Sequence, residues 1–177
     1  MVVLLILAVA DRRGWLLYDA DDRRRFDGRV VAVVEVVDAL TVRLADGDGD
    51  GSAAVTASLW GLTHPHHRAP QRRAEGGLSM HHRNGAQVQA MEQDAVERVR
   101  QLLGKGDIRV ELPPHRTRDA GGRLLVRLHL GDGRVLNEAL LLEGLAVVDA
   151  ATAHRHAERY RLLQAQARHD GRGWWSR

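Results

Sequence analysis

Residues 29–37 form a run of mostly β-branched residues, RVVAVVEVV, that stops at Asp38-Ala39 and resumes as TVRL over residues 41–44. β-Branched side chains favour extended backbone, and aspartate stabilises turns through its own side-chain hydrogen bonds. The pattern therefore predicts a strand, a turn and a second strand. The segment VTASLWGL, which begins at Val55, predicts a third strand. We expect these three strands to form an antiparallel meander.

The pattern changes to a helical period in the middle of the chain. Apolar residues recur at helical spacing over residues 86–103, which predicts one long helix. Residues 107–112 and 123–130 predict two more strands, and apolar side chains alternate along the second of them. We expect two further helices. One lies in the segment EALLLEG, with Asn137 as its cap, and the other spans residues 154–169.

Five strands, with one helix after the third and others after the fifth, describe a five-stranded OB-fold β-barrel with about three helices. A length of 177 residues and a hydrophobic content of 44% suit one domain with one core. We place this domain at residues 29–177 and treat residues 1–28 as an N-terminal extension. Apolar segments on both sides of Gly14 predict a β-hairpin in the extension, with a signal sequence as the alternative. Residues 21–27 predict a solvated linker.

The composition excludes some functions and leaves others open. The chain has no cysteine, which excludes disulfides, zinc–thiolate sites and thiol catalysis. Its 26 lysine and arginine residues are nearly offset by 23 aspartate and glutamate residues, so a net charge of +3 does not by itself indicate a nucleic-acid partner. The apolar stretch at residues 1–10 is too short to span a bilayer as a helix, and we expect no membrane partner. A cytoplasmic location is favoured over secretion.

Several ordered segments resemble the staphylococcal nuclease (thermonuclease) family. They are TVRL, LWGL before Pro65, Gly122-Arg123, GRVLNEALLLEGLA from Gly133, and the terminal Gly173-Trp174-Trp175. The resemblance covers residues 29–177 by position and implies an OB-type barrel that cleaves phosphodiesters. In that family, aspartates hold one calcium ion, two arginines neutralise the phosphate and a glutamate positions the attacking water. This chemistry needs cations and a carboxylate because the phosphodiester is an anion.

Most of these catalytic positions are substituted in this chain. At the first turn only Asp38 is present, and Leu40 stands at the principal metal-binding position. Arg123 matches the second arginine of the family. Three further positions carry other residue types: Ser58 for the first arginine, Thr63 for the second metal aspartate and His66 for the glutamate. Calcium takes six to eight oxygen ligands, so calcium-dependent cleavage is not expected.

Histidines and arginines supply the remaining candidates for a site. His64 and His66 lie on the same side of an extended segment, so together with Asp38 they are candidate ligands for zinc or another divalent metal. His66 and Arg123 are the candidate catalytic residues, and solvated histidines without a function are the alternative. The expected nucleic-acid contacts are all arginines: Arg123 and Arg127 in one strand, and Arg68, Arg72, Arg73 and Arg83 in the preceding loop.

The sequence therefore predicts a catalytically degenerate nuclease-like domain that binds nucleic acid, single-stranded or by its phosphate backbone, without calcium-dependent cleavage. Two alternatives stay open: an active phosphodiesterase or endonuclease with a rewired histidine or metal site, and a protein-interaction scaffold. Whether the chain is an enzyme is left open. We expect no resident cofactor, with zinc or another divalent metal as the alternative. Nucleic acid is the expected partner, with a protein partner as the second candidate.

Overall fold

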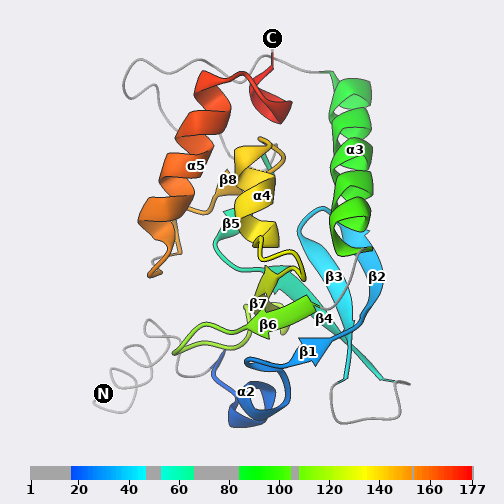
Figure 1. Ribbon diagram of the computed structural model, residues 1–177, viewed down its shortest axis with the longest axis vertical. Helices are drawn as coiled ribbons and strands as arrows, with labels where there is room; N and C mark the ends of the chain where they lie inside the picture. The colour runs from blue at the N-terminus through cyan, green and yellow to red at the C-terminus, as the bar shows by residue number, and fades with distance from the viewer. Residues whose placement is uncertain (1–16, 47–52, 66–83, 105–107, 153, 177) are drawn as a thin grey trace, which may run out of the picture.

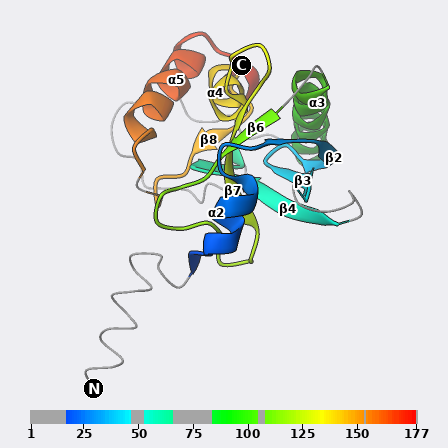
Figure 2. The same cartoon turned by 60° about the horizontal axis from the view of Figure 1, so that its bottom comes forward.

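The structure is a computed structural model, and it describes residues 17–46, 53–65, 84–104, 108–152 and 154–176. Three helices, α3 (Gly85–Leu103), α4 (Leu136–Leu142) and α5 (Ala157–His169), stand above the strands in Figure 1. A short helix, α2 (Ala20–Phe26), lies on the opposite side of the strands, as Figure 2 also shows. The predicted helices over residues 86–103 and 154–169 are thus confirmed within a few residues.

Six strands form one mixed sheet in the order β1-β6-β7-β4-β3-β2. They are β1 (Val30–Val31), β2 (Val33–Asp38), β3 (Thr41–Ala45), β4 (Ala54–Leu59), β6 (Ile108–Glu111) and β7 (Leu124–His129). A second pair joins β5 (Leu62–Thr63) to β8 (Val147–Val148). The predicted meander is confirmed, because β2, β3 and β4 pair antiparallel in that order.

The ends of the six-stranded sheet are joined by the chain itself. β1 and β2 stand at opposite ends of the strand order, yet Ala32 alone separates them in the sequence. One bent strand therefore pairs with β6 through its first residues and with β3 through the rest. β4 and β7 run parallel. This arrangement confirms the predicted OB-type barrel with added helices.

The barrel core is built from the inward side of each strand. In β7, Leu124, Val126 and Leu128 are fully buried, as their alternation predicts. Val42 and Leu44 on β3 belong to the same core cluster. The helices close the top of this core, since α4 contacts β7 and α5 packs against α4.

The predicted linker over residues 21–27 is wrong, because most of it forms α2. Asp19 caps this helix, and its carboxylate accepts a hydrogen bond from the helix's first turn. Asp22 and Phe26 lie one helical turn apart, and both are buried. The charged string therefore contains a face that packs on the barrel. The predicted N-terminal hairpin falls mainly on residues outside the described part of the chain.

The long helix α3 begins with a capping box that the prediction missed. Asn84 Oδ1 accepts a hydrogen bond from the backbone N–H of Gln87 at 2.9 Å, and Gln87 Oε1 accepts one from the backbone N–H of Asn84 at 3.0 Å. These two bonds satisfy backbone donors that have no partner within the helix. They start the helix at Gly85, one residue before the predicted start.

The predicted cap at Asn137 is also wrong. α4 begins at Leu136, and Asn137 is a fully buried residue within the helix. Its side-chain amide donates to the backbone oxygens of Trp60 and Val126 at 3.2 and 3.3 Å, and its oxygen accepts from the backbone N–H of Leu128 at 3.2 Å. Asn137 therefore holds α4 against β7 and the end of β4, because a buried amide needs such partners.

The C-terminal segment packs as its apolar residues predict. Ala157, Tyr160, Leu163 and Ala167 form the buried stripe of α5. Trp174 is buried as well, and its backbone N–H donates to the Gly144 oxygen at 3.0 Å. The end of the chain is thereby held against the turn that follows α4.

Candidate functional site

Arg123 begins the β7 side of a tight turn that Asp119 organises. Asp119 Oδ1 accepts hydrogen bonds from the backbone N–H groups of Gly121 and Arg123 at 2.9 and 3.0 Å. Its Oδ2 accepts from Arg123 Nε at 2.7 Å. The Arg123 side chain is 47% exposed, and its terminal nitrogens bond no other residue in the part of the chain that the structure describes. One edge of the guanidinium is held, and the other faces solvent.

Arg127, which follows four residues later on β7, has a different environment. Its Nη1 donates to Glu111 Oε2 at 2.8 Å and its Nη2 to Glu138 Oε1 at 2.7 Å. Only 10% of the side chain is exposed. Burial opposes the positive charge of Arg127, but the hydrogen bonds to the two glutamates prevail and raise its pKa. Arg127 is therefore held in an ion-pair network, and nucleic-acid contact by this side chain stays a prediction.

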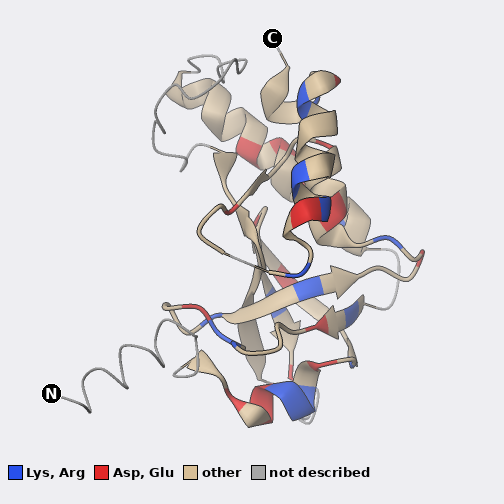
Figure 3. Ribbon diagram, turned by 90° about the vertical axis from the view of Figure 1, so that its left-hand side faces the viewer, with Lys and Arg blue, Asp and Glu red and all other residues tan. Residues whose placement is uncertain are grey.

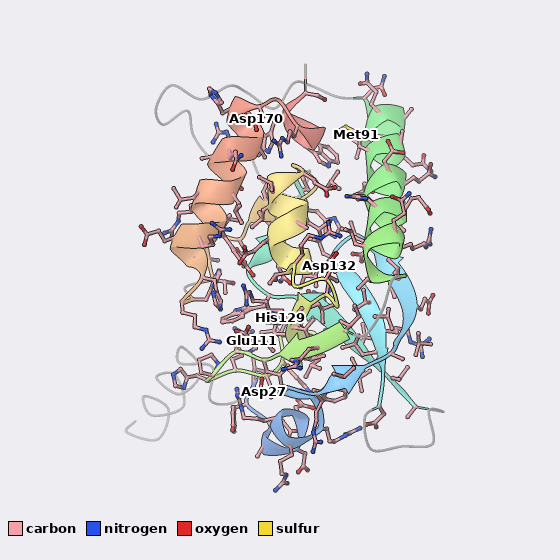
Figure 4. All side chains as sticks on the ribbon, viewed as in Figure 1. Asp27, Met91, Glu111, His129, Asp132 and Asp170 are labelled. Carbon is pink, nitrogen blue, oxygen red and sulfur yellow. The ribbon has the colours of Figure 1, made fainter. Side chains whose placement is uncertain are left out.

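Glu111 is the centre of this network, which the sequence did not predict. Besides Arg127, it contacts His129 Nε2 at 2.8 Å and His156 Nε2 at 3.2 Å, and it pairs with Arg155. Figure 4 shows Glu111 and His129 beside each other at the paired strands β6 and β7. Burial alone would raise the pKa of Glu111, but hydrogen bonds from these cationic and imidazole groups hold it well below its ordinary value.

Asp38 and His64 come together at the turn between β2 and β3. Asp38 Oδ1 lies 3.4 Å from His64 Nε2 and accepts the backbone N–H of Leu40 at 2.7 Å. On the other side of the ring, His64 Nδ1 lies 3.9 Å from Glu92 Oε1 on α3. Burial alone would raise the pKa of Asp38, yet hydrogen bonds from His64, Leu40 and Thr41 lower it to about 2.

This turn does not match the needs of calcium. Leu40, which the sequence predicted to stand at the family's principal metal position, is buried in the core cluster. Thr63 offers a hydroxyl where a second carboxylate is needed, and His64 offers nitrogen. Within the described residues, no three side chains of His, Cys, Asp or Glu are arranged to hold a metal ion.

The remaining predicted site residues cannot be compared with the structure. His66, Arg68, Arg72, Arg73 and Arg83 lie outside the described residues. Sequence reasoning missed Asp119, Glu92 and Glu111. A local signal was available only for Asp119, because an aspartate before two glycines is typical of a turn. In the described ranges, no helix has the length and apolar character needed to cross a membrane.

The barrel with its added helices is an OB-type fold, and an exposed arginine stands directly before β7. The sequence model of the staphylococcal nuclease homologues matches residues 57–177. The chain therefore belongs to the staphylococcal nuclease homologue family, which confirms the resemblance found in its sequence. Endonuclease YncB of Bacillus subtilis (strain 168) is 33% identical over 94 residues. That match covers 51% of this chain and 43% of the relative, so the chain spans less than half of that protein.

Proposed function

We propose that this chain is a catalytically degenerate nuclease-family domain, which binds nucleic acid by its phosphate backbone without calcium-dependent cleavage. The observation that carries the proposal is the geometry of Arg123. Asp119 holds its Nε at 2.7 Å, and the terminal nitrogens face solvent. A planar guanidinium in this pose suits two parallel hydrogen bonds to a phosphate, and its orientation is already fixed.

The same proposal accounts for the turn at Asp38. Calcium needs several hard oxygen ligands, and a buried Leu40 replaces one of them. Asp38 is already engaged by a backbone N–H and by His64. A phosphate bound at Arg123 would therefore lack the adjacent metal ion that activates water in the family's reaction.

A second candidate, hydrolysis with a histidine base, is favoured by one observation. Asp38 holds His64 as a carboxylate holds the imidazole of a general base. The other ring nitrogen, however, faces Glu92 and not open solvent. Both nitrogens are thus directed at carboxylates, which leaves no obvious position for the attacking water. We rank this candidate second for that reason.

Binding is tested by fluorescence anisotropy with a labelled single-stranded oligonucleotide at several salt concentrations. Arg123→Ala should weaken binding about tenfold and reduce the salt slope by roughly 0.7, the value for one phosphate contact on a single strand. Arg134→Ala is the matched control, because Arg134 is 51% exposed and is also paired with a nearby aspartate. Equal affinity of the wild-type chain and Arg123→Ala would contradict the proposal.

Cleavage is tested with the same oligonucleotide, as DNA and as RNA, in calcium, zinc, manganese or EDTA. We expect no calcium-dependent product. Metal-dependent cleavage that His64→Ala or His66→Ala abolishes would establish the second candidate instead. A chain that neither binds nor cleaves would leave the scaffold alternative.

A further inference from the structure

A pocket of about 380 Å³ lies between the segment that leads into α2 and the turn that carries Arg123. Two segments line it in equal parts: Leu17, Tyr18, Asp19 and Ala20, and then Arg118, Asp119, Ala120 and Gly122. The family match begins at residue 57, so the first of these segments lies outside it. The proposed phosphate contact uses none of the residues before position 57.

The two walls of the pocket are bonded to each other. The Leu17 oxygen accepts from the backbone N–H groups of Thr117 and Arg118, both at 3.0 Å. Thr117 Oγ1 accepts from the backbone N–H of Asp19 at 2.9 Å. Behind them, Arg118 Nε donates to the buried carboxylate of Asp22 at 2.7 Å. The pocket is therefore pre-formed, which lowers the entropic cost of binding.

The lining suits a flat, uncharged group and not a phosphate. Tyr18 is 41% exposed, and the guanidinium carbon of Arg23 lies over its ring, 5.8 Å from the centroid. A base would therefore stack on the face of the ring that Arg23 does not cover. Arg118 is occupied by Asp22 and by the Gly122 oxygen at 2.8 Å, and the other charged groups in the lining are the carboxylates of Asp19 and Asp119. Carboxylates repel phosphate but accept hydrogen bonds from the amino groups of nucleobases.

The pocket also adjoins the proposed phosphate contact. Asp119 lines the pocket and at the same time holds Arg123 Nε at 2.7 Å. A nucleotide bound here would meet the arginine through its phosphate and the pocket through its base. Only an unpaired base can enter such a pocket, which favours single-stranded nucleic acid.

We propose that this pocket is a nucleobase subsite, in which an unpaired base stacks on Tyr18 beside the phosphate that Arg123 holds. The inference rests on the proposed function. In this proposal, the segment before β1 contributes a contact with the base. The rest of the proposed site contacts only phosphate.

The test compares two labelled oligonucleotides of equal length, one with bases and one abasic. Tyr18→Ala should weaken binding of the base-containing strand about tenfold and leave the abasic strand unaffected, because stacking contributes only where a base is present. Tyr18→Phe should bind both strands as the wild-type chain does. Leu162→Ala is the control, since Leu162 is an exposed apolar residue on α5, far from α2 in both cartoon views.

Equal binding of the base-containing strand by Tyr18→Ala and the wild-type chain would overturn the subsite, even if Arg123→Ala weakens both strands. If the wild-type chain binds neither strand, the proposed function fails. Saturation-transfer NMR with free nucleosides then tests whether the pocket binds a nucleobase. Nucleosides carry no phosphate, so they report on the pocket without Arg123. Signals that Tyr18→Ala removes would support the subsite, and no signal from the wild-type chain would overturn it.

Discussion

Arg123, directly before β7, and Arg127, within β7, lie four residues apart and have opposite environments. Arg123 meets one aspartate from its own turn and stays half exposed, whereas Arg127 lies between Glu111 on β6 and Glu138 on α4 and is almost fully buried. The difference comes from the elements that face each residue, because carboxylates of β6 and α4 reach Arg127 whereas Arg123, among the described residues, pairs only within its own turn. In this segment, an arginine is a candidate phosphate contact only where no carboxylate of another element reaches it.

Arginines elsewhere in the described chain also lie close to carboxylates. Figure 3 shows blue basic and red acidic segments close together on α2, at the bottom of the view. Most described arginines are paired with a nearby carboxylate, in line with a net charge of only +3. Under the proposed function, nucleic-acid binding by this part of the chain would therefore depend on a few oriented arginines more than on overall charge.

Arg127→Ala should have the largest effect on stability. The substitution leaves Glu111 and Glu138 without their shared cation in a largely buried place, and we expect a loss of about 3 kcal/mol in the free energy of unfolding. Arg123→Ala should change it by less than about 0.5 kcal/mol, as expected for an exposed ion pair. Urea unfolding of both variants measures the two losses in the free energy of unfolding. Equal losses would contradict the difference in environment between Arg127 and Arg123.

Glu111→Gln should lower the free energy of unfolding by about 2 kcal/mol at neutral pH. Because the folded-state pKa of Glu111 lies below its ordinary value of 4.5, its stabilisation is present above that pH and is lost as the pH falls through the folded-state pKa. The variant should therefore lose less stability than the wild-type chain during acidification below about pH 4.5. Glu35→Gln, which alters an exposed pair with Arg43, is the control and should leave the acid profile unchanged.

Asp119→Asn tests how much the carboxylate that holds Arg123 contributes to binding. The variant loses the charge that holds Arg123 Nε, so the guanidinium becomes less ordered. We expect about threefold weaker binding of the abasic oligonucleotide, less than for Arg123→Ala, because the cation itself remains. Asp132→Asn, which alters the matched pair with Arg134, should not change binding. A larger loss for Asp119→Asn than for Arg123→Ala would show that Asp119 acts in another way.

The smallest effect is expected at Asp38. Its folded-state pKa of about 2 lies below its ordinary value of 3.8, so its stabilisation is present above pH 3.8 and disappears as the pH falls through 2. The side chain is partly exposed, and solvent screens the interaction. Thermal unfolding of Asp38→Asn should therefore differ from the wild-type chain slightly at pH 5, and the difference should shrink toward pH 2. A difference that grows on acidification would contradict the assigned pKa.

Much of the fold was predictable because its signals are local. The alternation of Leu124, Val126 and Leu128 identified β7, and the helical period identified α3 and α5. The errors arose where a short element depends on partners far along the chain. α2 was missed because Phe26 is buried only against the barrel, and Asn137 was misread as a cap because its true partners lie on other elements.

The residues of the candidate site also divide into those that the sequence predicted and those that depend on distant partners. The substitutions at Leu40 and Thr63 and the role of Arg123 are predictions from the sequence, since they follow from residue type at positions that resemble those of the family. Asp38 and His64 were predicted, with His66, as candidate metal ligands, but Glu92 comes from a helix that begins about twenty residues after His64. The pocket at Tyr18 required the packing of residues before β1 against a turn nearly a hundred residues away.

The sequence by itself determined the barrel, its main helices and the family, and it predicted the loss of the calcium carboxylates. The tertiary structure alone decided that Arg123 faces solvent while Arg127 is neutralised, and how Glu111 gathers residues as far apart as Arg127 and His156. The physical reason is that backbone propensity and residue chemistry belong to short segments. Burial, ion pairing and pKa depend on which distant groups the fold brings within a few ångströms.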